Sequence, residues 1–204
     1  MQKIAIFGAG GHGAVVADIL EALEIAYLVI DDMPQTKELN GARAIAKIDF
    51  LALKDAKEYG VALAIGNNAA RKNLYNFFTQ NGFCLPSIIH PSAIISKSAK
   101  IADAVVILPN AVINARSEIG VGAIINTASI IEHDCKVGAF AHIAPRATLC
   151  GGVDIGALTH VGASSVVIEG KSVGENCVVG AGSVVINSIP SFKRIVGNPA
   201  KKEI

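Results

Sequence analysis

The chain has 204 residues, of which 51% are apolar and only 5% aromatic, and its 18 Lys and Arg nearly balance its 17 Asp and Glu. A net charge of +1 argues against a nucleic-acid partner, because such partners are held by many basic side chains on phosphates. No segment reaches the roughly 18 consecutive apolar residues that span a bilayer, and no leader-like segment precedes the first strand pattern. We therefore expect a cytoplasmic protein without membrane insertion.

The first part of the chain alternates strand and helix patterns. Strand patterns cover residues 2–8, 26–32 and 61–66, and helical patterns cover 11–24, 48–60 and 68–82. Strands that alternate with helices predict a small parallel α/β domain of Rossmann-like type. The boundary falls between Pro86 and Pro91, so the expected domains are residues 1–85 and 86–204.

A glycine loop, GAGGHG at residues 8–13, stands between the first strand and the first helix in GxGxxG spacing. Such a loop turns tightly and leaves free amides at the helix start, which favour a phosphate. Acidic residues end the second strand about 20 residues later, where such folds contact a ribose or base. The predicted site residues of this domain are Gly10, Gly11, His12, Gly13, Asp31, Asp32, Gly66 and Asn67.

This first domain has no second mononucleotide-binding half, so the UDP end of a sugar nucleotide fits the available space better than a dinucleotide does. A plain strand-to-helix turn remains the simpler alternative for the glycines.

The second part of the chain repeats every six residues. From Ile89 to Val185 every sixth residue is Ile, Leu or Val, without a change of register, and the residue four positions later is usually small. This period fits a short strand plus a tight turn, repeated so that identical positions stack coil upon coil. The pattern predicts a parallel β-solenoid whose flat sides invite self-association.

Polar residues interrupt this repeat at IIEHDC, residues 130–135. His133 and Asp134 lie at the outward-facing turn of their hexad, whereas Cys135 occupies the inward small position. A carboxylate beside an imidazole selects one tautomer and favours the imidazolium, which makes the imidazole a stronger base. The pair is therefore a candidate general base, with two solvated surface residues as the alternative.

Longer motifs resemble one enzyme family over nearly the whole chain. INTASIIEHDC, AHIAPRATLCGGVDIG and VGNPAKKEI, together with GHG, DD and AIGNNAARK in the first domain, resemble the NeuD/PglD branch of hexapeptide-repeat acetyltransferases. The resemblance implies a left-handed parallel β-helix with three hexads per coil and a homotrimer with reaction sites between neighbouring solenoids. It also implies acetyl-CoA as co-substrate and no metal.

The resemblance further implies roles for individual residues. His133 is the expected general base, Asp134 raises its basicity, and His142 contacts the thioester. Ala163 and Ala181 are expected to line the acetyl-CoA groove. Asn126 is expected to orient the base or the sugar, and the first domain is expected to bind the UDP-sugar.

The expected reaction moves the acetyl group of acetyl-CoA to the 4-amino group of a UDP-linked amino-deoxy sugar by direct attack. The alternatives are a sialic acid O-acetyltransferase, a metal-dependent solenoid of carbonic-anhydrase type, and a UDP-sugar-binding protein without catalysis. The basic residues near the C-terminus either contact CoA phosphates or form a solvated tail.

With three hexads per coil, His142 and His160 should stack about 5 Å apart, since they are one coil apart at the same hexad position. A zinc site would need a third converging histidine, and His133 is already paired with Asp134.

Overall fold

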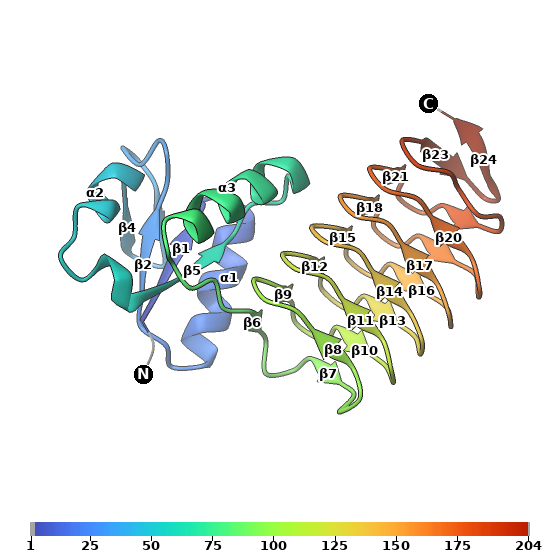
Figure 1. Cartoon of the computed structure of the whole chain (residues 1–204), viewed down its shortest axis with the longest axis horizontal. Coiled ribbons are helices and arrows are strands. Elements are labelled where there is room, and N and C mark those ends of the chain that lie inside the picture. The colour runs from blue at the N-terminus through green and yellow to red at the C-terminus, as the bar shows by residue number, and fades with distance from the viewer. Residues whose placement is uncertain (1–2, 204) are drawn as a thin grey trace. The chain divides into compact units, whose positions relative to one another are not determined.

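The computed structural model describes residues 3–203, which divide into two compact units between Pro91 and Ser92 (Figure 1). None of the described helices is long and apolar enough to cross a membrane. In chain order the first unit contains β1 (Lys3–Phe7), α1 (Gly11–Ala22), β2 (Tyr27–Ile30), β3 (Glu38–Leu39), β4 (Ala42–Ile45), α2 (Lys47–Leu51), a 3₁₀ helix (Ala56–Glu58), β5 (Tyr59–Leu63), α3 (Asn68–Gln80) and β6 (Ile88–Ile89).

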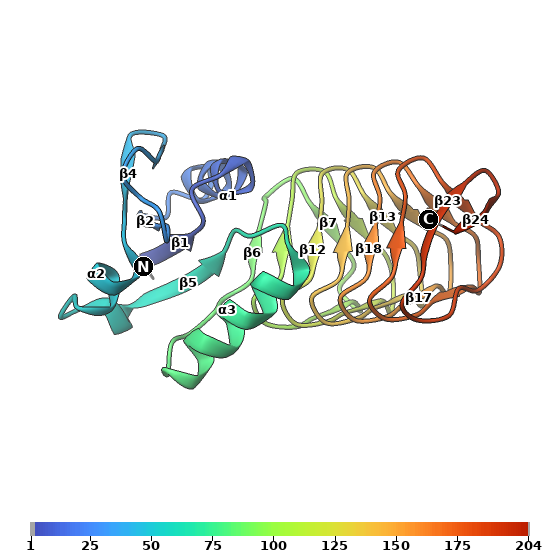
Figure 2. The same cartoon turned by 90° about the horizontal axis from the view of Figure 1, so that it is seen from above.

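The first unit is a Rossmann-like α/β domain built on a five-stranded sheet. The strand order is β3-β4-β2-β1-β5, and all neighbours are parallel except β3 and β4, which form an antiparallel hairpin. Figure 2 shows α1 and α3 on opposite sides of this sheet. Phe78 of α3 packs edge-on against Phe7 of β1, with ring centroids 5.6 Å apart. The core thus lies between the central strands and the helices.

Two features of this unit differ from the sequence prediction. The helix predicted over residues 48–60 is wrong: α2 ends at Leu51, and β5 begins at Tyr59, where it pairs in parallel with Lys3 of β1. Burial of β5 beside β1 outweighs the local helical pattern, because tertiary packing routinely overrides weak propensity. The β3–β4 hairpin was not predicted.

The second unit is a left-handed parallel β-helix, drawn in green to red in Figure 1. Its strands have two residues each and begin every six residues, and each pairs in parallel with the strand 18 residues away. They are β7 (Ile94–Ile95), β8 (Lys100–Ile101), β9 (Val106–Ile107), β10 (Val112–Ile113), β11 (Glu118–Ile119), β12 (Ile124–Ile125), β13 (Ile130–Ile131), β14 (Lys136–Val137), β15 (His142–Ile143), β16 (Thr148–Leu149), β17 (Asp154–Ile155), β18 (His160–Val161), β19 (Val166–Val167), β20 (Ser172–Val173), β21 (Val178–Val179) and β22 (Val184–Val185). An antiparallel hairpin, β23 (Arg194–Gly197) and β24 (Ala200–Glu203), ends the solenoid.

The second residue of each two-residue strand points inward, and from Ile107 to Val185 all of these side chains are buried. The first residue points the other way, because side chains alternate along a strand. The outward residues give three faces: an aliphatic face (Ile94, Val112, Ile130, Thr148, Val166 and Val184), a charged face (Lys100, Glu118, Lys136, Asp154 and Ser172) and a histidine face (Val106, Ile124, His142, His160 and Val178). The hexad register of the sequence is therefore the register of the coils.

Candidate active site

His133 and Asp134 lie at the corner where the chain passes from the aliphatic face to the charged face. His133 Nδ1 is 2.8 Å from Asp134 Oδ2, and both side chains are exposed. Hydrogen bonds from Arg116 and then His133 hold the pKa of the Asp134 carboxyl far below its usual range. An ionised carboxylate only accepts hydrogen bonds, so Nδ1 carries the imidazole proton and Nε2 presents a free lone pair. This is the tautomer that a general base requires.

Gly151 lies one coil after His133 and leaves room for the imidazole. A Cβ atom added at Gly151 would be 2.6 Å from Cε1 and 2.7 Å from Nε2 of His133. The amide N–H of Gly152 donates to the carbonyl oxygen of His133 at 2.9 Å, which fixes the backbone of the two coils at this corner. The ring therefore packs over the main chain of the next coil. Sequence reasoning missed both Gly151 and Arg116, although each lies one coil from the histidine–aspartate pair.

His142, on the histidine face, is oriented by Asn126 of the preceding coil. The Thr127 amide donates to Asn126 Oδ1 at 2.7 Å, so the amide nitrogen of Asn126 faces His142 Nε2 at 2.9 Å. Nε2 therefore accepts this hydrogen bond, and the proton of the neutral ring is on Nδ1. Asn126 thus contacts His142 and not His133.

The predicted stacking of His142 on His160 is confirmed. The two residues are register partners in neighbouring strands, and their ring centroids are 4.8 Å apart in an edge-to-face arrangement. Within residues 3–203 no three His, Cys, Asp or Glu side chains converge as a metal site would require.

His133 and His142 leave the solenoid on opposite sides. They are nine residues apart, which is half of an 18-residue coil. His133 lies at the corner between the aliphatic and charged faces, and this corner is opposite the histidine face in a three-sided coil. The two imidazoles of one solenoid therefore point away from each other.

Ala163 and Ala181 follow the histidine face at the same corner of successive coils. The Gly182 amide donates to the carbonyl of Ala163 at 2.8 Å, which links the two coils there. Neither Ala163 nor Ala181 donates its own amide N–H to a backbone carbonyl among the residues that the structure describes. Small side chains leave these amides at the surface of the corner.

Near the C-terminus, Lys193 forms an ion pair with Glu203 at 2.8 Å, and Arg194 and Lys201 are exposed. The charge of Lys193 is therefore partly neutralised within the terminal hairpin.

In the first unit, the glycine loop joins β1 to α1 as predicted. Gly8 has a φ of 112°, and Gly13 lies so close to the Gly8 carbonyl that no Cβ fits there. A Cβ at Gly10 or Gly11 would meet nothing within 4 Å. The loop therefore turns tightly on its inner side and is open above Gly10 and Gly11, where a ligand phosphate has access to the helix start.

The two acidic residues after β2 have different surroundings. Asp31 is only 8% exposed, and its oxygens accept hydrogen bonds from the Ala9 amide, the Met33 amide and Lys37 Nζ. Burial raises the pKa of Asp31, but these hydrogen bonds outweigh burial and the net pKa is lowered. Asp32 is 60% exposed and 3.4 Å from Lys47. Asp31 therefore braces the glycine loop, while Asp32 faces solvent.

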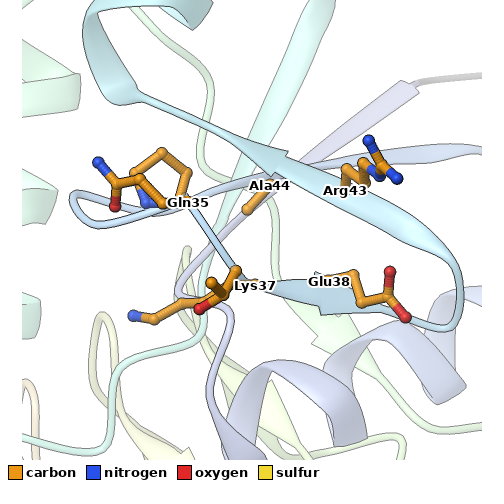
Figure 3. A pocket seen from close by; sticks show the side chains of 7 residues that line it. Gln35, Lys37, Glu38, Arg43 and Ala44 are labelled. Atoms are coloured by element: carbon orange, nitrogen blue, oxygen red, sulfur yellow. The ribbon is translucent and has the colours of Figure 1, made fainter.

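A pocket of about 430 Å³ at the β3–β4 hairpin is lined by Pro34, Gln35, Thr36, Lys37, Glu38, Arg43 and Ala44 (Figure 3). Lys37, which holds Asp31, is part of its wall. The pocket is thus linked to Asp31 through Lys37.

A buried arginine in α3 contacts the chain just after β5. Arg71 is fully buried, and its guanidinium donates to the carbonyls of Ile65 and Gly66 at 2.9 and 3.2 Å. Burial lowers the pKa of Arg71 to about 10, and burial together with the Arg71 charge lowers the pKa of His12 to about 4. His12 is therefore neutral at pH 7. Asn67 caps α3, since its Oδ1 accepts from the Ala70 amide at 2.9 Å.

Comparison with known proteins links both units to one family. Residues 3–78 match the family model described as the PglD N-terminal domain. The chain is 34% identical to a mutant of perosamine N-acetyltransferase from Caulobacter crescentus, solved in complex with CoA and GDP-perosamine. This similarity covers 98% of the chain and 95% of that protein, with a TM-score of 0.94. The chain belongs to the NeuD/PglD family of sugar acetyltransferases.

Two other proteins support membership of the NeuD/PglD family. The acetyltransferase domain of PglB from Neisseria gonorrhoeae is 36% identical, with a TM-score of 0.93 over 98% of the chain and 99% of that domain. UDP-N-acetylbacillosamine N-acetyltransferase of Bacillus subtilis is 37% identical over 116 residues. That match spans 53% of the chain and about half, 52%, of the curated relative's length. The predicted family and fold class are confirmed.

Proposed function

We propose that the protein transfers the acetyl group of acetyl-CoA to the 4-amino group of a UDP-linked amino-deoxy sugar. The observation that carries the proposal is the contact between His133 Nδ1 and Asp134, which leaves Nε2 as a proton acceptor on an exposed corner. Family members support the chemistry, since one is named for UDP-N-acetylbacillosamine and another holds CoA and GDP-perosamine. A nucleotide-linked amino sugar is common to both family members.

The reaction that we propose is a direct transfer. The sugar amine attacks the acetyl carbonyl while His133 Nε2 receives the amine proton. The tetrahedral oxyanion is stabilised by hydrogen-bond donors, and the CoA thiolate leaves. His142 contacts the thioester from the histidine face, and the corner amides of Ala163 and Ala181 bind the pantetheine arm of acetyl-CoA.

Direct transfer is favoured over a covalent acyl-enzyme by the state of Cys135. This thiol is buried, burial raises its pKa, and its Sγ contacts the Cys150 carbonyl at 3.1 Å. A nucleophilic cysteine needs the opposite conditions, a lowered pKa and exposure.

The first unit is proposed to hold the nucleotide. The open glycines Gly10 and Gly11, with His12 and Gly13 at the start of α1, bind the phosphates. Asp32 contacts the ribose or base, and Asp31 acts through the loop that it braces. Gly66 and Asn67 border the same edge of the sheet.

We further propose a homotrimer whose reaction sites each take His133 from one copy and His142 from the next. The half-coil separation of the two histidines supports this, because one solenoid cannot direct both at one acetyl group. The aliphatic face offers a continuous surface for self-association, since contiguous apolar patches seldom stay exposed to water.

The test is a thiol-release assay with acetyl-CoA against UDP-4-amino-sugars, GDP-linked 4-amino sugars, free amino sugars and sialic acid. We expect turnover with a UDP-4-amino-sugar. Preference for the GDP-linked sugar would overturn the choice of nucleotide, and turnover with sialic acid alone would overturn N-acetylation. Binding of a UDP-sugar without any thiol release would favour a sugar-nucleotide-binding protein.

A further inference from the structure

The Asp134 carboxylate lies between two basic groups. Arg116 Nε donates to Oδ1 at 2.6 Å, and a terminal nitrogen of the same guanidinium donates to Oδ2 at 2.8 Å. Oδ2 also accepts from His133 Nδ1 at 2.8 Å. One carboxylate oxygen is thus shared between the guanidinium and the proposed base.

Arg116 and Asp134 meet because they are one coil apart. They occupy the same corner position, with φ values of 60° and 61°, so their side chains leave the coils in parallel. The Arg116 amide donates to Ser98 Oγ in the coil before at 3.1 Å, and the Asp134 amide donates to the Ala115 carbonyl at 3.0 Å. The backbone on both sides of the ion pair is therefore fixed.

We propose that Arg116 is a positioning residue, which fixes Asp134 in the plane that holds His133 Nδ1 and partly neutralises the carboxylate. The inference rests on the proposed role of His133. Asp134 is half exposed, and without the guanidinium its carboxylate would rotate and exchange its bond to the imidazole for water. Two parallel N–H donors match both oxygens of a carboxylate and remove that freedom.

Two substitutions test the fork, and nitrogen NMR of the free protein reads the imidazole directly. The His133 resonances are identified by their loss in His133→Ala. In the native protein the neutral ring should carry its proton on Nδ1, which Asp134 accepts. In Arg116→Met and Arg116→Lys the two tautomers should mix, because neither side chain offers two parallel donors to the carboxylate. A pure Nδ1–H tautomer in both variants would overturn the positioning role.

Kinetics then test position. In Arg116→Met and Arg116→Lys, kcat should fall about tenfold, because neither side chain offers the planar fork. Lys100→Met is the matched control. It removes another exposed ion pair between neighbouring coils, that of Lys100 with Glu118 at 2.8 Å, which lies away from the site.

Native kcat in both Arg116 variants would overturn the positioning role. The NMR measurement needs no turnover, so it remains decisive for the positioning role if the proposed acetyl transfer fails. Loss of transfer in the native protein would instead contradict the proposed function itself.

Discussion

At the scale of single residues, a change at His133 should slow the chemical step without weakening sugar-nucleotide binding, because the residues proposed to hold the sugar nucleotide belong to the other unit. We expect His133→Ala to lower kcat by at least about a hundredfold, the usual contribution of a general base. UDP-sugar affinity, measured by calorimetry, should stay native. Lys136→Ala, an exposed change three residues away, serves as the control. Near-native turnover of His133→Ala would remove this residue from the proposed role.

His12 makes the stability of the first unit depend on pH. Its pKa falls from 6.5 when unfolded to about 4 when folded, so the unfolded chain binds more protons between these values. The stabilisation is fully present above pH 6.5 and is lost as pH falls towards 4, on the order of 3 kcal/mol in total. The three tyrosines, Tyr27, Tyr59 and Tyr75, all lie in the first unit, and Trp is absent.

Urea unfolding followed by tyrosine fluorescence therefore reports on this unit. The free energy of unfolding should fall between pH 6.5 and 4.5 in the native protein and fall less in His12→Gln. Equal slopes for the two proteins would contradict the assignment.

At the scale of elements, the sequence predicts the solenoid far better than the α/β unit. Each hexad repeats one environment, so an error at one position is corrected by the neighbouring coils, and the stacking of His142 on His160 follows from the period once three hexads make a coil. The β3–β4 hairpin depends on a single turn, Asn40–Gly41, whose φ values of 48° and 83° suit a type I′ turn. That dipeptide was the available signal for a hairpin.

Parts of the candidate site were predictable to different degrees. His133 and Asp134 are adjacent in sequence, and their contact follows from that adjacency. The contact of Asn126 with His142 crosses a corner between coils over 16 residues, so it depends on side-chain reach and not on register. Arg116 and Gly151 become predictable only once the coil length of 18 residues is applied.

The turn that carries Gly151 provides a test of how the coils shape the site. Gly151→Ala should lower kcat by about tenfold or more, since its Cβ displaces the His133 ring from the backbone of the next coil. The control is Gly152→Ala, where φ is 70° but nothing lies within 4 Å of the added Cβ. That change should cost about 1 kcal/mol of stability and leave kcat near native. The reverse order of the two kcat values would contradict this account.

At the scale of the whole molecule, the proposed trimer makes a quantitative prediction for mixed assemblies. His133→Ala and His142→Ala chains are each expected to be inactive alone. If the chains are unfolded and refolded together in equal amounts, about a quarter of the sites in random closed trimers join an intact His133 to an intact His142. Thiol release should therefore recover to about a quarter of the native rate. A mixture as inactive as its components would mean that each site is confined to one chain.

The coil length also constrains how this chain can change in length. Arg116, Asp134 and Gly152 occupy one corner at intervals of 18 residues, so insertion or loss of a single residue that stays in the coil would shift the later members by one hexad position, out of line with the earlier ones. The gain or loss of a whole 18-residue coil preserves the alignment. Within residues 116–152, however, even such a change would separate residues that contact one another at this corner. Descendants of this gene should accordingly differ in length by whole coils, which are added or lost before or after the segment that contains His133.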